Sequence, residues 1–259
     1  MNIKVKNLSS GISIILINEP KTYNSLSFQN LTDLIKVFKK LDKDKKTKVI
    51  IIEGSGKGFS AGHNLKEVKN LKVRNKYQKL FNLCSKLMIQ IVEGRKPVIA
   101  KVQGYAIGGG NVLAAICDMT IASENAQFGQ VGPKVGSVDP GFGTAYLAQV
   151  VGEKKAREIW YLCRRYTAFE ALDMGLVNTV VPVDSLDHEV AKWCAEIMER
   201  SPTAISIAKR SFNAATDHVK GISSMGMQAL ALYYNTAESR EGVLAFNEKR
   251  KPNFRKHLK

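Results

Sequence analysis

The fold is decided by residues 96–118, KPVIAKVQGYAIGGGNVLAAICD. The short apolar run Val98–Val102 predicts a buried strand. Three glycines follow at positions 108–110, and residues 111–117 have the composition of a helix. A second apolar run at residues 119–122 predicts another strand. Strands that alternate with helices in this way indicate an α/β fold whose strands are joined by crossover connections.

Outward from this stretch the same alternation continues towards the N-terminus. β-branched runs at Ile12–Ile17 and residues 49–52 predict two more strands, and apolar residues at helical spacing predict a helix over residues 27–41, with Ser27 as its cap. After Pro140 the pattern becomes helical. Six helices are expected there, at residues 152–163, 168–174, 187–200, 203–215, 222–236 and 240–248. We therefore expect a core at residues 1–186 and a helical region at residues 187–259.

Composition narrows the class of protein. The 259 residues are 44% hydrophobic and 24% charged, which excludes a disordered or fibrous chain. The net charge is +16, and the first 96 residues hold 20 basic and 7 acidic side chains. Scattered lysines with few interleaved aromatics are typical of a solvated surface, so nucleic acid is an unlikely partner. The histidines lack metal-ligand spacing, so no metal is expected. The cysteines are isolated, which is typical of a reducing compartment. The sequence does not start with a long apolar run, and its most apolar stretch is interrupted by polar residues. We therefore expect a cytoplasmic protein without a membrane span.

The two glycine-containing loops predict a binding site made of backbone groups. Residues 108–110 lie between a strand and a helix, and residues 59–67, FSAGHNLKE, also follow a predicted strand and open a predicted helix. Glycine permits close approach of the backbone, and a helix N-terminus has unpaired N–H groups. Tight packing alone would also explain the glycines. Two such loops can hold one carbonyl oxygen from two sides, which suits a thioester whose oxygen becomes an enolate.

Three segments taken together resemble the crotonase (enoyl-CoA hydratase/isomerase) superfamily. They are FSAGHNLKE, the stretch at residues 96–118 and AQFGQVGPKVGS at residues 126–137. The resemblance implies a spiral of ββα units, a C-terminal helical trimerisation region and coenzyme A thioesters as substrates. It implies an oxyanion hole formed by the N–H groups of His63 and Gly109. The implied coenzyme A contacts are Lys21, Ser60, Ala61 and Leu65, with Lys249 at a phosphate.

The same resemblance argues against the usual water addition. Hydratases of the superfamily use two glutamates, and the corresponding positions here are Val112 and Gly132. Neither residue can transfer a proton, so hydration by that pair is not expected. In some naphthoyl-CoA synthases such a glycine leaves room for a bicarbonate that replaces the carboxylate. The threonine that binds it there corresponds to Val131 here, which weakens this option.

Residues 129–141, GQVGPKVGSVDPG, resemble a subgroup that makes or breaks carbon–carbon bonds, the 1,4-dihydroxy-2-naphthoyl-CoA synthases and 2-ketocyclohexanecarboxyl-CoA hydrolases. Their catalytic aspartate corresponds to Asp139, and their tyrosine, placed near a neighbouring subunit's site, corresponds to Tyr234. Ser137 is expected to hold the keto or hydroxyl oxygen of the substrate. From the residues alone, Asp139 could also be a helix cap and Tyr234 a core or interface aromatic. Residues 62–65, GHNL, instead resemble ordinary hydratases.

The leading hypothesis is therefore hydrolytic ring cleavage of a cyclic 2-ketoacyl-CoA, or the related naphthoyl-CoA ring closure. An enoyl-CoA hydratase or isomerase that uses Asp139 alone is the first alternative. An RNA-binding relative is an alternative of another class, and a catalytically inactive trimer is a further one. No cofactor is expected apart from the coenzyme A of the substrate, with bicarbonate weakly supported. The expected assembly is a homotrimer or a dimer of trimers.

Overall fold

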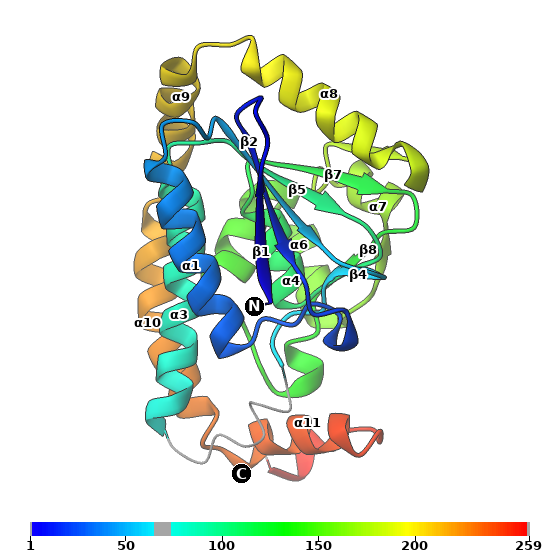
Figure 1. The fold of residues 1–259 in the computed structure, drawn as a ribbon. Helices are drawn as coiled ribbons and strands as arrows, with labels where there is room; N and C mark the ends of the chain where they lie inside the picture. Colours follow the sequence, from blue (N-terminus) through cyan, green and yellow to red (C-terminus); the bar gives the residue numbers. More distant parts are fainter. Residues whose placement is uncertain (1, 65–73, 258–259) are drawn as a thin grey trace.

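A computed structural model describes residues 2–64 and 74–257 of the chain. Its larger sheet has six strands in the order β1-β2-β3-β5-β7-β10 (Figure 1). All neighbouring strands of this sheet are parallel except β1, which is antiparallel to β2. The bounds are β1 Ile3–Asn7, β2 Ile12–Ile17, β3 Val49–Gly54, β5 Val98–Val102, β7 Met119–Ser123 and β10 Thr179–Val181. The predicted α/β architecture with crossover connections is confirmed.

The central strands are largely apolar because both faces of the sheet are covered, and Lys101 of β5 is paired with Glu53 of β3. Along β3, Val49 and Ile51 belong to a small cluster that includes residues of helix α8 (Leu186–Met198). Ile50 and Ile52 point the other way, into the main core. Helices α1 (Phe28–Lys43) and α3 (Arg74–Glu93) supply much of that core and lie side by side (Figure 1).

A second, smaller sheet has the order β4-β6-β8-β9. Its strands are β4 Gly58–Ser60, β6 Tyr105–Ile107, β8 Gln127–Gly129 and β9 Tyr166–Thr167. The first three are parallel, and β9 is antiparallel to β8. The carboxyl ends of β4, β6 and β8 therefore meet at one edge, and the segments that leave this edge begin with the later residues of the three motifs singled out above.

The predicted helices are present with small shifts in their bounds. Helix α1 begins after Ser27, whose hydroxyl accepts a hydrogen bond from the N–H of Asn30 at 3.1 Å, so the predicted cap is confirmed. Helix α4 begins on the glycines themselves, two residues earlier than expected. The remaining elements are α4 Gly109–Ala115, α5 Leu147–Val151, α6 Glu153–Leu162, α7 Ala168–Asp173, α9 Pro202–Ala214, α10 His218–Tyr233 and α11 Ala237–Asn247, with single turns at Pro20–Thr22, Pro133–Val135, Phe142–Tyr146, Val183–Ser185 and Phe254–His257.

The C-terminal helices belong to the same core as the sheet. Met227, Leu230 and Val243 are buried in the main cluster, and α10 runs beside α3 (Figure 1). Helix α9 is joined to the sheet by Lys209, which is 5% exposed and lies 2.7 Å from the carboxylate of Asp118. An oligomerisation role for residues 187–259 stays a prediction. Among the described residues, no helix is both long enough and apolar enough to cross a membrane.

Candidate active site

One cavity brings together residues from the carboxyl edge of the small sheet and from the C-terminal helices. Its lining includes His63 after β4, Gly109 after β6 and Gly132 after β8. It also includes Ser137 and Asp139, which follow Gly132 within seven positions, and Tyr234, which is far from the glycines in sequence. Ligands of α/β proteins commonly bind at the carboxyl ends of parallel strands. The position therefore fits a substrate site.

The two proposed oxyanion amides are held together by close contact between their loops. A Cβ atom on Gly62 would lie 2.6 Å from the backbone nitrogen of Gly109, and Gly62 has a φ of +79°. A Cβ on Gly110 would lie 2.0 Å from the carbonyl oxygen of Ser60. Only glycine permits this approach. Within residues 2–64 and 74–257, the N–H groups of His63 and Gly109 donate to no backbone or side-chain acceptor, so both are free for a ligand.

The side chain of His63 is held away from proton chemistry. Its Nε2 lies 2.9 Å from the sulfur of Cys84 on α3, and burial lowers the pKa of the imidazole to about 4. Burial raises the pKa of the Cys84 thiol well above its usual range. The pair is therefore neutral near pH 7, and it fixes the ring beside the hole. This fits the expectation that His63 contributes its backbone N–H.

Asp139 has the properties of a general base. Its carboxylate accepts a hydrogen bond from the N–H of Gly143 at 3.1 Å, and burial raises the pKa of the carboxyl to about 6. The indole N–H of Trp160 donates to the carbonyl of the same Gly143. A Cβ on Gly143 would lie 2.6 Å from the Cβ of Asp139, so the turn needs glycine. A base with a pKa just below neutrality is both ionised and basic at pH 7.

Tyr234 and Ser137 form a hydrogen-bonded pair in this cavity. The phenol of Tyr234 donates to the hydroxyl of Ser137 at 2.6 Å, and the tyrosine is 6% exposed. Its ring packs against Phe81 of α3, with the centroids 5.2 Å apart. The resemblance places this tyrosine near a neighbouring subunit's site, whereas here Tyr234 lines the cavity of its own chain.

Val112 and Gly132, which correspond to the two glutamates of hydratases, both lie in the cavity wall. Val112 is 1% exposed and makes the wall apolar. A Cβ on Gly132 would lie 2.6 Å from the Trp160 ring and 2.7 Å from the carbonyl oxygen of Ser137. The space where a glutamate side chain would start at position 132 is therefore occupied by Trp160.

The predicted coenzyme A contacts differ in their surroundings. Lys21 and Ala61 are exposed, and Ala61 also lines the cavity. Ser60 is fully buried, and its hydroxyl donates to the carbonyl of Asn24 at 2.8 Å, so its side chain is structural. Lys249 is exposed just after α11 with a φ of +54°. Leu65, and the helix expected to begin near it, lie outside the described residues.

Sequence reasoning assigned no site role to several of the cavity's residues. Cys84 and Phe81 belong to α3, a helix that the sequence analysis did not identify although its apolar residues have helical spacing. Trp160 is 5% exposed and forms part of the wall. Gln130 also lines the cavity. Its position directly after the strand that leads into the Gly132 loop was the signal that could have identified it.

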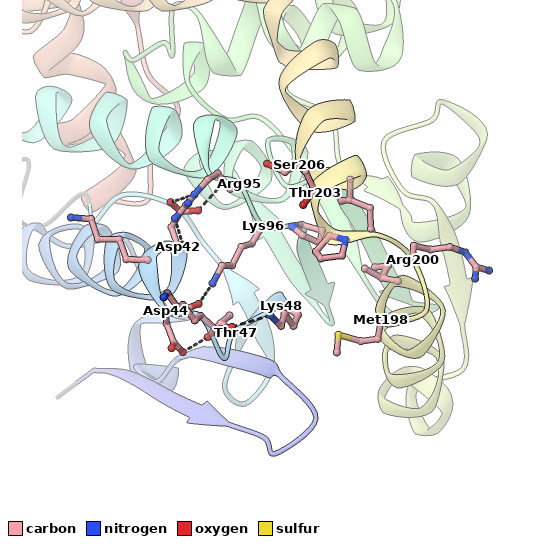
Figure 2. A pocket seen from close by; sticks show the side chains of 16 residues that line it. Asp42, Asp44, Thr47, Lys48, Arg95, Lys96, Met198, Arg200, Thr203 and Ser206 are labelled. Carbon is pink, nitrogen blue, oxygen red and sulfur yellow. Dashed lines mark hydrogen bonds and ion pairs between the residues drawn. The ribbon is translucent and has the colours of Figure 1, made fainter.

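A larger cavity of about 790 Å³ lies elsewhere, where α1 and α3 end and α9 begins. Figure 2 shows its lysines and arginines, several of which already bind neighbouring groups. Arg95, for example, binds Asp42, and Lys96 binds backbone carbonyls at the end of α1. This cavity is at the amino ends of β3 and β5, and the predicted site residues do not line it.

Comparison with known proteins agrees with the arrangement of these loops. A family model described as enoyl-CoA hydratase/isomerase matches residues 7–257. The chain belongs to the enoyl-CoA hydratase/isomerase family. It is similar to an enoyl-CoA hydratase from Mycobacterium avium subsp. paratuberculosis, with 30% identity, 98% of each chain covered and a TM-score of 0.87.

Two further solved structures extend the comparison. An enoyl-CoA hydratase from Bacillus anthracis has 32% identity, 98% coverage of each chain and a TM-score of 0.78. Human enoyl coenzyme A hydratase domain-containing protein 3 has 32% identity over 98% of this chain and 100% of that one, with a TM-score of 0.79. The crotonase-like fold is thus confirmed, and the protein is an acyl-CoA enzyme of the hydratase/isomerase type.

Proposed function

We propose that this family member hydrolyses a carbon–carbon bond in the ring of a cyclic 2-ketoacyl-CoA. The observation that carries the proposal is the set of groups around the oxyanion amides. A carboxyl group with a raised pKa, Asp139, shares the cavity with the Ser137–Tyr234 pair. Val112 and Gly132 stand where a hydratase needs glutamates. These groups suit a single base and a phenol as proton donor.

In this mechanism the thioester oxygen binds between the N–H groups of His63 and Gly109. Asp139 takes a proton from water, the water oxygen bonds to the ring ketone carbon, and the carbonyl electron pair moves to the ketone oxygen. When that pair returns, the bond to the thioester α-carbon breaks. Its electrons are delocalised into the thioester oxygen, which the two amides stabilise. Tyr234, or protonated Asp139, then returns a proton to the α-carbon. The product is a linear acyl-CoA with a terminal carboxylate.

The test is incubation with 2-ketocyclohexanecarboxyl-CoA in water enriched in oxygen-18, followed by mass spectrometry. We expect a product heavier by one labelled water, with the label in the new carboxylate and no free coenzyme A. Release of labelled cyclic acid and free coenzyme A would indicate thioester hydrolysis and contradict the proposal. A lack of any reaction would also contradict it. The related naphthoyl-CoA ring closure uses the same groups for an enolate that attacks a carbonyl.

A second candidate is enoyl-CoA hydration or isomerisation with Asp139 as the one acid or base. The names of the solved relatives favour it, since two of those compared above are called enoyl-CoA hydratases. Crotonyl-CoA distinguishes the two candidates. Rapid water addition to crotonyl-CoA, with no reaction of the cyclic ketone, would replace the first proposal by the second.

We also propose that copies of the chain associate as a trimer or a dimer of trimers in the cytoplasm. Large apolar side chains are exposed on the outer helices, including Phe212 at 77% and Tyr161 at 70%. Large exposed apolar side chains of this kind become buried when they lie in an interface between proteins. Light scattering coupled to gel filtration tests the assembly. A single species at the mass of one chain, 28.6 kDa, would contradict it.

A further inference from the structure

Gln130 has an amide that the protein itself leaves without a partner. The residue is 2% exposed and lines the cavity that contains Asp139 and Gly109. Among the described residues, its Nε2 has no hydrogen-bond partner. A buried amide without a partner is unfavourable, and native proteins normally satisfy it. A bound molecule in the cavity is therefore the natural partner for this group.

The backbone around Gln130 is fixed from both sides. Gly129 accepts a hydrogen bond at 2.9 Å from the N–H of Gly108, in the loop of the oxyanion hole. Val131 accepts another at 3.2 Å from the N–H of Val135, in the turn that leads to Ser137. The Gln130 backbone is thus fixed between the loop of the proposed oxyanion hole and the turn that leads to Ser137.

The ring-opening mechanism needs a hydrogen-bond donor at a second oxygen. When water adds to the ring ketone, negative charge develops on the ketone oxygen, which is separate from the thioester oxygen. The two backbone amides serve the thioester. Asp139 is an acceptor while it is ionised, so it cannot stabilise a second anion. Ser137 accepts from Tyr234 and retains one proton to donate.

We propose that the Gln130 carboxamide donates a hydrogen bond to the ring ketone oxygen and stabilises the alkoxide formed when water adds. Gln130 and Ser137 then make a second oxyanion site that selects acyl groups with an oxygen on the ring carbon next to the thioester-bearing carbon. This inference rests on the proposed function. Rotation about the last side-chain bond exchanges the oxygen and nitrogen of the carboxamide. The N–H₂ group can therefore face the ligand from either starting orientation.

The test compares wild type with Gln130→Met, which keeps the side-chain length and removes the polar atoms. We expect kcat for ring opening to fall by ~10²–10³, the usual effect of removing one oxyanion donor. Calorimetric titration then measures the binding affinity of each enzyme for two unreactive esters, 2-hydroxycyclohexanecarboxyl-CoA and cyclohexanecarboxyl-CoA. Wild type should bind the hydroxy ester more tightly, and Gln130→Met should lose about 10-fold of that preference while it binds the plain ester unchanged.

Gln127→Met is the matched control, because Gln127 lies in the same segment and does not line the cavity. Removal of an unpaired buried amide should leave the Tm of Gln130→Met equal to or above that of wild type. A lower Tm with unchanged ester preference would assign Gln130 a structural role and overturn the inference. If wild type opens the ring and Gln130→Met does so with the same kcat, the inference is also overturned. Wild type that leaves the ring intact would instead reject the proposed function.

Discussion

The two sides of the active-site cavity are built from different kinds of atoms. On the oxyanion side the working groups are the backbone amides of His63 and Gly109, held by glycine contacts between two loops. On the acid side they are the side chains of Ser137, Asp139 and Tyr234. Backbone groups depend on the fold, whereas side chains change by single substitutions. We therefore expect relatives to share the backbone groups and to differ in the side chains that set the reaction.

Asp139→Asn separates the two sides most sharply. Asparagine keeps the shape and the hydrogen bond from Gly143 but cannot accept the proton of water, so ring opening should fall by ~10³–10⁴. Binding of cyclohexanecarboxyl-CoA should stay within about threefold, since the amides are untouched. Steady-state kinetics and calorimetry measure the two effects. Asp184→Asn, at an exposed position, is the control, and full activity of Asp139→Asn would remove this residue from the mechanism.

Gly62→Ala tests the oxyanion side. The added methyl group would lie 2.6 Å from the Gly109 nitrogen, at a φ of +79° that alanine disfavours. The two amides should move apart, and kcat should fall by ~10²–10³ for any thioester substrate. Gly221→Ala is the control, because its methyl group meets no atom within 4 Å. Equal losses of turnover in the two variants would show that the effect is not specific to the hole.

Tyr234→Phe tests the proton donor on the acid side. The ring still packs against Phe81, but the hydrogen bond to Ser137 is lost. Loss of a general acid should lower kcat by ~10². The matched control is Tyr233→Phe, because the hydroxyl of Tyr233 donates to Glu238 at 3.3 Å, outside the cavity. A normal kcat in Tyr234→Phe would leave protonated Asp139 as the donor.

The smallest expected effect is on stability and depends on pH. Folding raises the pKa of Asp139 from 3.8 to about 6, so the buried charge opposes folding above pH 6 and has no effect below pH 4, where the group is neutral in both states. Asp139→Asn should therefore be more stable than wild type by about 2–3 kcal/mol at pH 8. The advantage should disappear near pH 3.5. Urea unfolding at both pH values measures the difference in free energy of unfolding between the two proteins. An equal difference at both pH values would contradict the raised pKa of Asp139.

Local patterning predicted the elements that surround the site, whereas the roles of Asp139 and Tyr234 were implied only by the family resemblance. The strand runs, the Ser27 cap and the glycine loops follow from short-range preferences, and each appears in the structure. The pairing of Tyr234 with Ser137 joins residues 97 positions apart, and no spacing rule gives that distance. It could be suspected from resemblance alone.

Other parts of the site could not be predicted because they depend on packing between distant elements. Trp160 fills the space beside Gly132 and also binds the carbonyl of Gly143, and both contacts need the folded loop. The free amide of Gln130 is likewise visible only once its surroundings are known. Contacts of this kind are not encoded in any short motif, so the sequence pattern identified the family more firmly than the substrate.

The position of Tyr234 near the end of the chain has a consequence for biosynthesis. A ribosome adds the strands and both oxyanion loops long before it adds this tyrosine, and the last residues leave the exit tunnel only after synthesis ends. Because α10 packs against α3, the cavity is complete only once the last helices have joined the core. The cavity wall that Tyr234 completes is the last part of the site to be assembled.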